Sequence, residues 1–227
     1  MQSEIVYRPA YAMARVRLEA NEEIQVEAGS MVSMSSGISI ETSARGGILK
    51  SLARSMLGGE SFFVNTFRAP AQGGMMTLAP ALPGDMVVLD LNGESLMVQS
   101  GGYVASGGGI EVDTKWGGGK TFFASEGLIL LRAVGSGSLI LSSYGAIDEI
   151  TLEAGQGITI DTGHLVAFTE GIGFNVRSVG GFKSTLFSGE GLVVDLTGPG
   201  RVLMQTRSQD AFLAWLIPQL PKDTSSS

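Results

Sequence analysis

One short pattern occurs three times in the chain and decides the fold: Val26-Glu-Ala-Gly29-Ser-Met31-Val32, Val98-Gln-Ser-Gly101-Gly-Tyr103-Val104 and Ile160-Asp-Thr-Gly163-His-Leu165-Val166. Each copy leads to a second Gly and then to an alternating run, as in Gly37-Ile38-Ser-Ile40. An aliphatic segment, a Gly turn and alternation are typical of a β-hairpin. The pattern therefore predicts three hairpins of one kind.

Other markers keep the same order around these hairpins. Gly74, Gly137 and Gly200 each begin an apolar run, with a constant step of 63 residues. A hydroxyl residue followed by apolar residues and Phe occurs in each copy, at Ser61–Phe63, Thr121–Phe123 and Thr185–Phe187. A repeat of this length cannot bury both faces alone, so neighbouring copies must stack. We expect three copies of one multi-strand unit, at about 1–68, 69–132 and 133–207.

These units predict the fold class. We expect a single all-β domain over 1–207, a three-fold internally repeated β-sandwich or barrel of the double-stranded β-helix kind. A short inserted helix and a short C-terminal helix complete the prediction. Because closure would remove exposed strand edges, we further expect residues 200–206 to pair with the N-terminal strand at 3–8 and close the ring.

The inserted stretch around 46–57 has apolar residues at Ile48, Leu52 and Met56, which is the spacing of a helix about three turns long. Lys50 and Arg54 lie on its other face. We favour a helix that caps the β-domain. The alternative is a basic amphipathic helix that contacts a membrane or an acidic partner through Lys50, Leu52, Arg54 and Met56.

A second helix is expected at 208–220, followed by a flexible tail at 221–227. Asp210 suits its first turn, and Pro218 ends it. Phe212 and Trp215 belong to a large apolar surface for so short a helix. We favour docking of this surface onto the protein's own sheet. The alternative is a contact with a partner or a membrane, in which Trp215 would take part.

Composition excludes several classes of protein. Charged residues are only 16% of the chain and the formal net charge is −7, which argues against a nucleic-acid-binding surface. With no cysteine, disulfides and thiolate metal sites are excluded. The apolar runs are too short for a transmembrane helix. We expect a cytoplasmic protein, with a location peripheral to a membrane as the alternative.

Candidate catalytic residues are few. His164 is the single histidine, and a catalytic or metal-binding role would need partners supplied by the fold. Glu126 and Glu190 occupy equivalent positions before Gly, which favours equivalent turns over an acid/base pair. Gly117–Thr121 lacks the spacing of a phosphate-binding loop. We therefore expect no catalytic, cofactor-binding or metal-binding residues and no cofactor. An enzyme using His164 or the two glutamates is the weakest alternative.

Several phrases resemble a known family: Gly58-Gly-Glu-Ser-Phe-Phe63, Ala79-Pro80 with Pro83-Gly84, Val166-Ala-Phe168, Gly189-Glu-Gly-Leu192, Gly198-Pro-Gly200, Gln205-Thr-Arg207 and the Trp-Leu-Ile-Pro tail. Together they resemble the altered-inheritance-of-mitochondria family, formerly a domain of unknown function. The resemblance implies a fold like that of the tryptophan-attenuation protein, and self-association. It implies no catalytic residue. The RNA binding of the attenuation protein has no matching residue in this chain, and the mitochondrial association of some family members has no matching transit peptide.

Two functions remain open at this stage. The first is a non-enzymatic, self-associating scaffold or interaction protein, expected as a homo-oligomer with no nucleic acid partner. The alternative is a module that binds a small ligand, or lipid at a membrane surface, with the basic helix at 46–57.

Overall fold

The computed structural model describes residues 1–41, 64–113, 122–123, 128–179 and 192–221. Several sequence predictions lie outside these residues: the helix at 46–57 with Lys50, Leu52, Arg54 and Met56, the glutamates Glu126 and Glu190, the turn at 117–121, and residues 222–227 of the tail.

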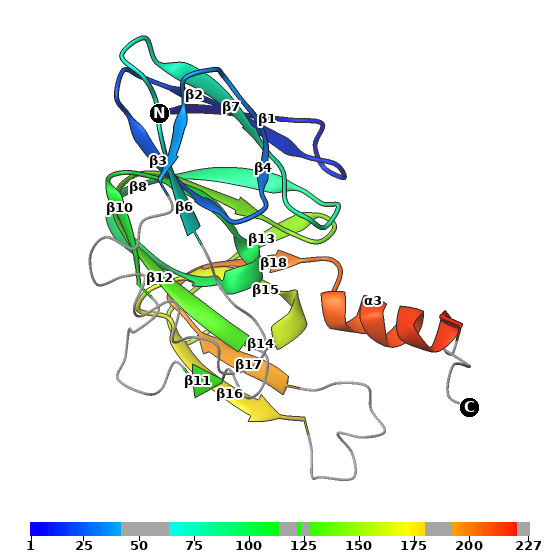
Figure 1. Ribbon diagram of the computed structural model, residues 1–227. Helices are drawn as coiled ribbons and strands as arrows, with labels where there is room; N and C mark the ends of the chain where they lie inside the picture. The colour runs from blue at the N-terminus through cyan, green and yellow to red at the C-terminus, as the bar shows by residue number, and fades with distance from the viewer. Residues whose placement is uncertain (42–63, 114–121, 124–127, 180–191, 222–227) are drawn as a thin grey trace.

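The described residues are mostly β-strands (Figure 1). The strands are β1 (Gln2–Val6), β2 (Met13–Leu18), β3 (Glu23–Glu27), β4 (Met31–Met34), β5 (Ser39–Glu41), β6 (Val64–Arg68), β7 (Gly74–Leu78), β8 (Met86–Gln99), β9 (Tyr103–Gly107), β10 (Ile110–Asp113), β11 (Phe122–Phe123), β12 (Leu128–Ser142), β13 (Ile147–Leu152), β14 (Gly157–Asp161), β15 (Leu165–Thr169), β16 (Gly173–Ser178), β17 (Leu192–Thr197) and β18 (Gly200–Gln205). Short 3-10 turns are η1 (Ser100–Gly102), η3 (Thr162–His164) and η4 (Ile217–Gln219), and α3 spans Gln209–Leu216.

The strands form antiparallel sheets that pack in a sandwich-like arrangement. A four-stranded sheet has the order β1-β2-β7-β4, and a three-stranded sheet has the order β14-β17-β16. The largest sheet, of 11 strands, has the order β13-β18-β15-β8-β12-β9-β3-β6-β5, with β10 and β11 also paired to β12. The four-stranded and three-stranded sheets lie at opposite ends of the molecule (Figure 1).

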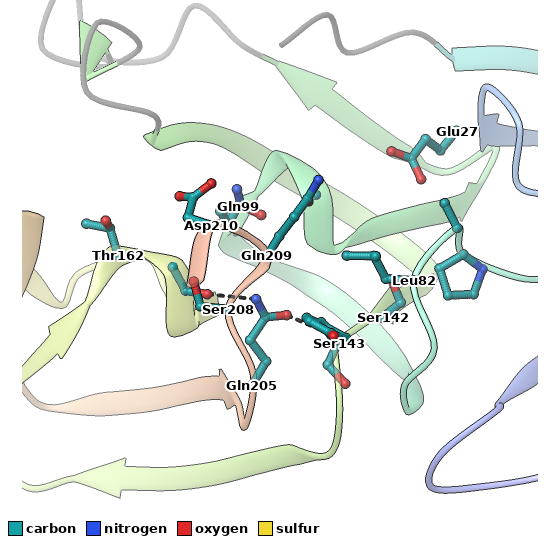
Figure 2. Close-up of a pocket in the computed structure, with 15 residues that line it drawn as sticks. Glu27, Leu82, Gln99, Ser142, Ser143, Thr162, Gln205, Ser208, Gln209 and Asp210 are labelled. Carbon is teal, nitrogen blue, oxygen red and sulfur yellow. Dashed lines mark hydrogen bonds between the residues drawn. The ribbon is translucent and has the colours of Figure 1, made fainter. Parts of the chain in front are cut away.

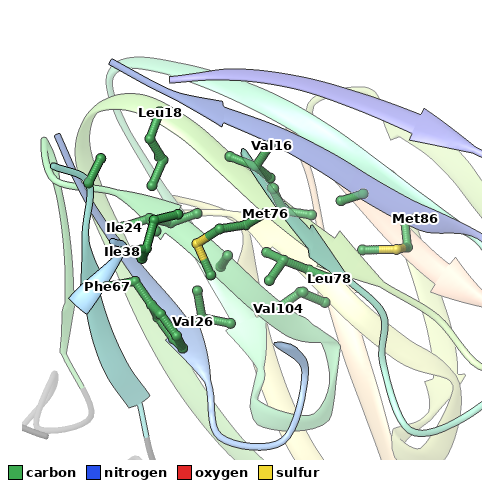
Figure 3. Packing of buried hydrophobic residues seen from close by; sticks show 14 of the residues in the cluster. Val16, Leu18, Ile24, Val26, Ile38, Phe67, Met76, Leu78, Met86 and Val104 are labelled. Carbon is green, nitrogen blue, oxygen red and sulfur yellow. The ribbon is translucent and has the colours of Figure 1, made fainter. Parts of the chain in front are cut away.

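Period-two alternation explains why these segments are strands. In β2 the side chains of Ala14, Val16 and Leu18 are buried, whereas Arg15 and Arg17 between them are exposed. Successive side chains of a strand point to opposite faces, so β2 buries one face and leaves the other in solvent. Figure 3 shows that buried face packed against β3, with Met76 and Leu78 of the neighbouring β7 beside it in the same sheet.

The two longest strands connect three hydrophobic clusters. From β8, Met86 belongs to the first cluster, Leu91 to the second and Met97 to the third. β12 also contributes to all three, because Ile140, Leu131 and Leu128 belong to the first, second and third cluster respectively. Neighbouring residues of these strands belong to different clusters because both faces of the strands are buried, as with Met97 and Val98. The register of β12 against β8 shifts between Val134 and Ser136, which bends the pair locally.

The predicted ring closure is wrong. β18 pairs with β13 on one side and with β15 on the other, while β1 pairs with β2 at the edge of the four-stranded sheet. Because both edges of β18 are already hydrogen-bonded, this strand cannot accept β1 as a further neighbour. Among the described strands no pairing closes the sheets into a barrel.

The C-terminal helix is present but does not dock as expected. The Ser208 hydroxyl accepts a hydrogen bond from the Ala211 amide at 3.4 Å, which caps the first turn of α3. No residue of α3 is buried, and the helix extends away from the strands (Figure 1). The rings of Tyr144 and Phe212, with centroids 6.1 Å apart, connect its first turn to the β-domain. The prediction that its apolar surface packs on the protein's own sheet is therefore corrected.

Candidate functional site: a polar cleft at the base of the C-terminal helix

A cleft of about 260 Å³ lies where the ends of β3, β8, β12 and β18 approach the start of α3 (Figure 2). Its polar lining carries carboxylate, amide and hydroxyl groups, from Glu27, Gln99, Ser142, Ser143, Tyr144, Thr162, Gln205, Ser208, Gln209 and Asp210. Pro80, Ala81, Leu82, Gly101 and Gly163 complete the wall. The cleft thus collects residues from turns that are far apart in the sequence.

Glu27, the last residue of β3, is the lining carboxylate with the most altered environment. Burial raises its pKa to about 7, and the hydrogen bond from the Ser30 hydroxyl to its Oε2, at 3.0 Å, lowers the pKa in part. A buried carboxylate prefers its neutral form because the surrounding medium stabilises the charge poorly. Glu27 therefore changes charge close to neutral pH.

Gln205 holds one wall of the cleft together. Its side-chain Nε2 donates to the Gly163 carbonyl at 2.8 Å, and its Oε1 accepts from the Tyr144 amide at 2.8 Å. Both groups of the amide are thus used to connect the end of β18 to two turns. Gln205 has a structural role in this wall, as Figure 2 also shows.

The chemistry of the lining limits what the cleft can bind. The described lining has two carboxylates, Glu27 and Asp210, and no Lys, Arg or His. Amides and hydroxyls both donate and accept hydrogen bonds, so the lining suits a neutral polar molecule or a cation better than a phosphate or carboxylate. Among the described residues no three His, Cys, Asp or Glu side chains are grouped as metal ligands.

His164 lies beside this wall, at the end of η3. Its Nδ1 is 2.7 Å from the backbone carbonyl of Gln205. A carbonyl can only accept, so Nδ1 carries the hydrogen and the ring is oriented by β18. The neighbouring Asp161 carboxylate accepts from the Gly163 amide at 2.8 Å. These hydrogen bonds give His164 and Asp161 a structural role, because both side chains stabilise the turn η3.

Trp215 is the one predicted contact residue that the described part of the chain includes. Its side chain is 63% exposed on α3, and its ring lies 6.1 Å from that of Phe212. Leu213, Ile217 and Leu220 are exposed on the same C-terminal segment. The structure therefore places an apolar surface in solvent on the C-terminal segment, whereas the cleft is lined only by Ser208, Gln209 and Asp210 from this segment.

Sequence reasoning did not identify Glu27 as a site residue. A signal was available, because Glu27, Gln99 and Asp161 each stand two residues before the turn Gly of the repeated pattern. A side-chain oxygen at the same position in every copy indicates a shared role beside the turn. The burial that alters Glu27 could not be predicted from this spacing.

A family model described as mitochondrial biogenesis AIM24 matches residues 3–207. The chain belongs to this AIM24 family. It is similar to the uncharacterized protein M6_Spy0233 of Streptococcus pyogenes serotype M6, with 29% identity over 96% of this chain and 89% of that protein. The fold is similar to the crystal structure of protein SPYM3_0169 from Streptococcus pyogenes, with a TM-score of 0.79, 27% identity, and coverage of 96% and 99% of the two chains.

The family match covers the β-domain and not the C-terminal helix. It includes every described strand from β2 to β18 and ends before α3. The resemblance that the sequence indicated is therefore confirmed at the level of the AIM24 family. Within the part of the chain that the structure describes, no helix is both long and apolar enough to cross a membrane.

Proposed function

We propose that this protein is a non-enzymatic, self-associating scaffold or interaction protein built from three copies of one unit. The observation that carries this proposal is the run of exposed large apolar side chains on the C-terminal segment: Phe212, Leu213, Trp215, Ile217 and Leu220. Further exposed large apolar side chains come from the loop before β2 and from β4, β5 and β7: Tyr7, Tyr11, Val32, Met34, Ile40 and Met75. Grouped apolar side chains on a surface are typical of protein contact sites.

The strand pairings support the three-unit part of the proposal, with the unit boundaries placed after β7 and after β12 instead of at about 68 and 132. In the first unit β7 lies between β2 and β4, and β6 lies between β3 and β5. In the last unit β18 lies between β13 and β15, and β17 lies between β14 and β16. In the middle unit β12 takes both central places, since it pairs with both halves of β8, with β9 and with β10. Repeated units of this kind present repeated contact surfaces, as a scaffold requires.

The molar mass in solution tests this function. Light scattering coupled to size exclusion, over micromolar concentrations, is expected to give a mass of two or more chains. The concentration should be varied because a small interface binds weakly and dissociates on dilution. A mass equal to one chain at every concentration would overturn the self-association proposal.

The cleft favours a second candidate function, the binding of a small polar ligand. Its two carboxylates and its amide and hydroxyl groups suit polyols or small amines. Thermal shift with glucose, glycerol, ethanolamine and putrescine as probes tests this, with phosphate as the ion that the lining should reject. A shift that is abolished by Glu27→Gln supports the candidate, and equal shifts in both proteins argue against it.

The membrane-surface form of this alternative depends on the predicted helix at 46–57, outside the described residues. Flotation with anionic vesicles tests it directly. Binding lost in the double variant Lys50→Glu and Arg54→Glu supports it, and no binding, or binding unchanged in that variant, argues against it.

A further inference from the structure

Neighbouring units inside the chain are joined by one repeated strand pairing. β3 of the first unit pairs antiparallel with β9 of the second, with Val26 opposite Ala105. β8 of the second unit pairs antiparallel with β15 of the third, with Val98 opposite Ala167. Val26 and Val98 occupy the same place in the repeated sequence pattern, and so do Ala105 and Ala167. Both junctions therefore have the same register.

The two terminal units leave the corresponding edges uncovered. β4 is the counterpart of β9 and β15, and it stands last in the order β1-β2-β7-β4. β14 is the counterpart of β3 and of the second half of β8, and it stands first in the order β14-β17-β16. Neither edge has a further strand neighbour among the described residues. β4 and β14 lie well apart in the molecule, so they cannot pair with each other within one chain (Figure 1).

Burial distinguishes β4 from its counterparts. Val32 is 58% exposed, whereas the equivalent Val104 and Val166 are 0% and 1% exposed. Met34 is 38% exposed, whereas the equivalent Phe168 is 1% exposed. The position of Val32 is therefore buried in both counterparts of β4, each of which is paired with a strand of the preceding unit.

The free edges also lack the features that normally prevent strands from pairing. β4 has neither a charged residue nor Pro, and β14 has one charged residue, Asp161. The Asp161 carboxylate accepts a hydrogen bond from the Gly163 amide, which directs it to its own turn. Exposed edges in soluble proteins are usually protected by Lys, Pro or a bulge, because unpaired backbone groups recruit another strand. The register of β4 against β7 shifts between Met31 and Ser33. The same shift occurs at the equivalent place in β9 and β15, which both pair with a further strand, so it does not prevent β4 from pairing.

We propose that β4 of one copy of this chain pairs antiparallel with β14 of a second copy, in the register of the internal junctions. In that register Ser33 lies opposite Ile160, and Met34 lies opposite Thr159. The four-stranded sheet of one copy and the three-stranded sheet of the next become one continuous sheet. Since each chain has one edge of each kind, the contact is head-to-tail and forms a ring or an open chain of copies. This inference rests on the proposed self-association and specifies its contact.

Disulfide cross-linking tests the register, because the natural chain has no cysteine. Met34 and Thr159 are both exposed, so Met34→Cys and Thr159→Cys are expected to fold normally. Directly opposed residues of paired strands are about 4.5–5.5 Å apart at Cα, which a disulfide can span. An oxidised equimolar mixture of the two single variants is expected to form a covalent dimer.

The controls separate this contact from others. Each variant oxidised alone should form no comparable dimer, because a head-to-tail contact does not bring two equivalent residues together. A mixture of Met34→Cys with Asn175→Cys tests β16, the other edge of the three-stranded sheet, and should form none. A dimer in every mixture, or in none, overturns the proposed pairing.

A charge at the edge gives a second test. Val32→Glu should keep the thermal midpoint of the wild type, because the side chain is exposed in one copy. It should weaken association at least about tenfold, because pairing would bury the new charge and place it opposite Asp161 in the proposed register. If the wild type is an oligomer and neither test responds, the β4–β14 contact is wrong and the scaffold proposal stands. A single-chain mass for the wild type, with no cross-link, overturns both.

Discussion

At the scale of single residues, Glu27 shows how position in the fold changes chemistry. Its sequence equivalents Gln99 and Asp161 also line or flank the turns, yet Glu27 is the carboxylate that lies in the cleft with its pKa raised. Asp161 directs its carboxylate to the Gly163 amide, whereas Glu27 accepts from the Ser30 hydroxyl. A neutral hydroxyl compensates the buried charge only in part, so desolvation determines the outcome.

This difference predicts a pH-dependent stability. The pKa of Glu27 rises from an ordinary 4.5 to about 7 in the folded protein. The stability that its neutral form contributes is therefore fully present below about pH 4.5. That stabilisation is lost as the pH rises through about 7, because the folded state then holds a partly buried charge. Glu27→Gln should therefore be more stable than the wild type at about pH 8, by roughly 1–3 kcal/mol, and nearly equal to it at about pH 4.

Urea unfolding at the two pH values measures the effect. Glu4→Gln, at an exposed position of β1, is the matched control and should show no such dependence. A Glu27→Gln variant that is less stable than the wild type at high pH would show that the carboxylate is stabilised by its surroundings.

At the scale of elements, α3 shows that a helix can form without being packed on the domain. Its Ser208 cap and Asp210 in the first turn favour the helix locally. Yet none of its residues is buried, so tertiary contacts contribute little to holding it in place.

A truncation after Ser208 is therefore expected to leave the β-domain intact. The contact between Tyr144 and Phe212 is the described ring contact that would be lost. Such a pair contributes about 0.5–1.5 kcal/mol, so the thermal midpoint should fall by only a few degrees. Differential scanning fluorimetry measures this shift. A fall of more than about 10 °C, beyond what such a loss allows, would mean that α3 packs on the strands after all.

The long strands are a further difference at this scale. The repeated pattern predicts equivalent units, whereas the middle part of the chain has two strands of unusual length, β8 with 14 residues and β12 with 15. Gly93, with φ of +90°, and Gly135, with φ of +133°, lie where these strands change cluster. Glycine adopts such backbone angles without steric cost, so the chain bends there and remains hydrogen-bonded.

At the scale of the whole molecule, β8 and β12 make the three clusters depend on one another. Unfolding any cluster would remove the partners of strands that also belong to the other two. We therefore expect a single cooperative thermal transition, although the proposed units could unfold separately in a looser repeat protein.

Calorimetry of Leu131→Ala tests this coupling. Leu131 is fully buried in the middle cluster, so the substitution should cost about 2–5 kcal/mol. The whole transition should shift to lower temperature and remain single, with calorimetric and van't Hoff enthalpies in agreement. A second transition that stays at the wild-type temperature would show that the terminal units unfold independently.

The sequence by itself determined the features that depend on local pattern. Alternation determined the strands, as in β2, Asp210 and Pro218 indicated the C-terminal helix, and the quoted phrases identified the family. Tertiary structure alone decided which edges pair, since the ring predicted from 3–8 and 200–206 does not form once β13 and β15 occupy both sides of β18. It also decided the exposure of α3 and the partial burial of Glu27. Long-range pairing and desolvation depend on which surfaces meet in space, and the spacing of residues along the chain does not specify that.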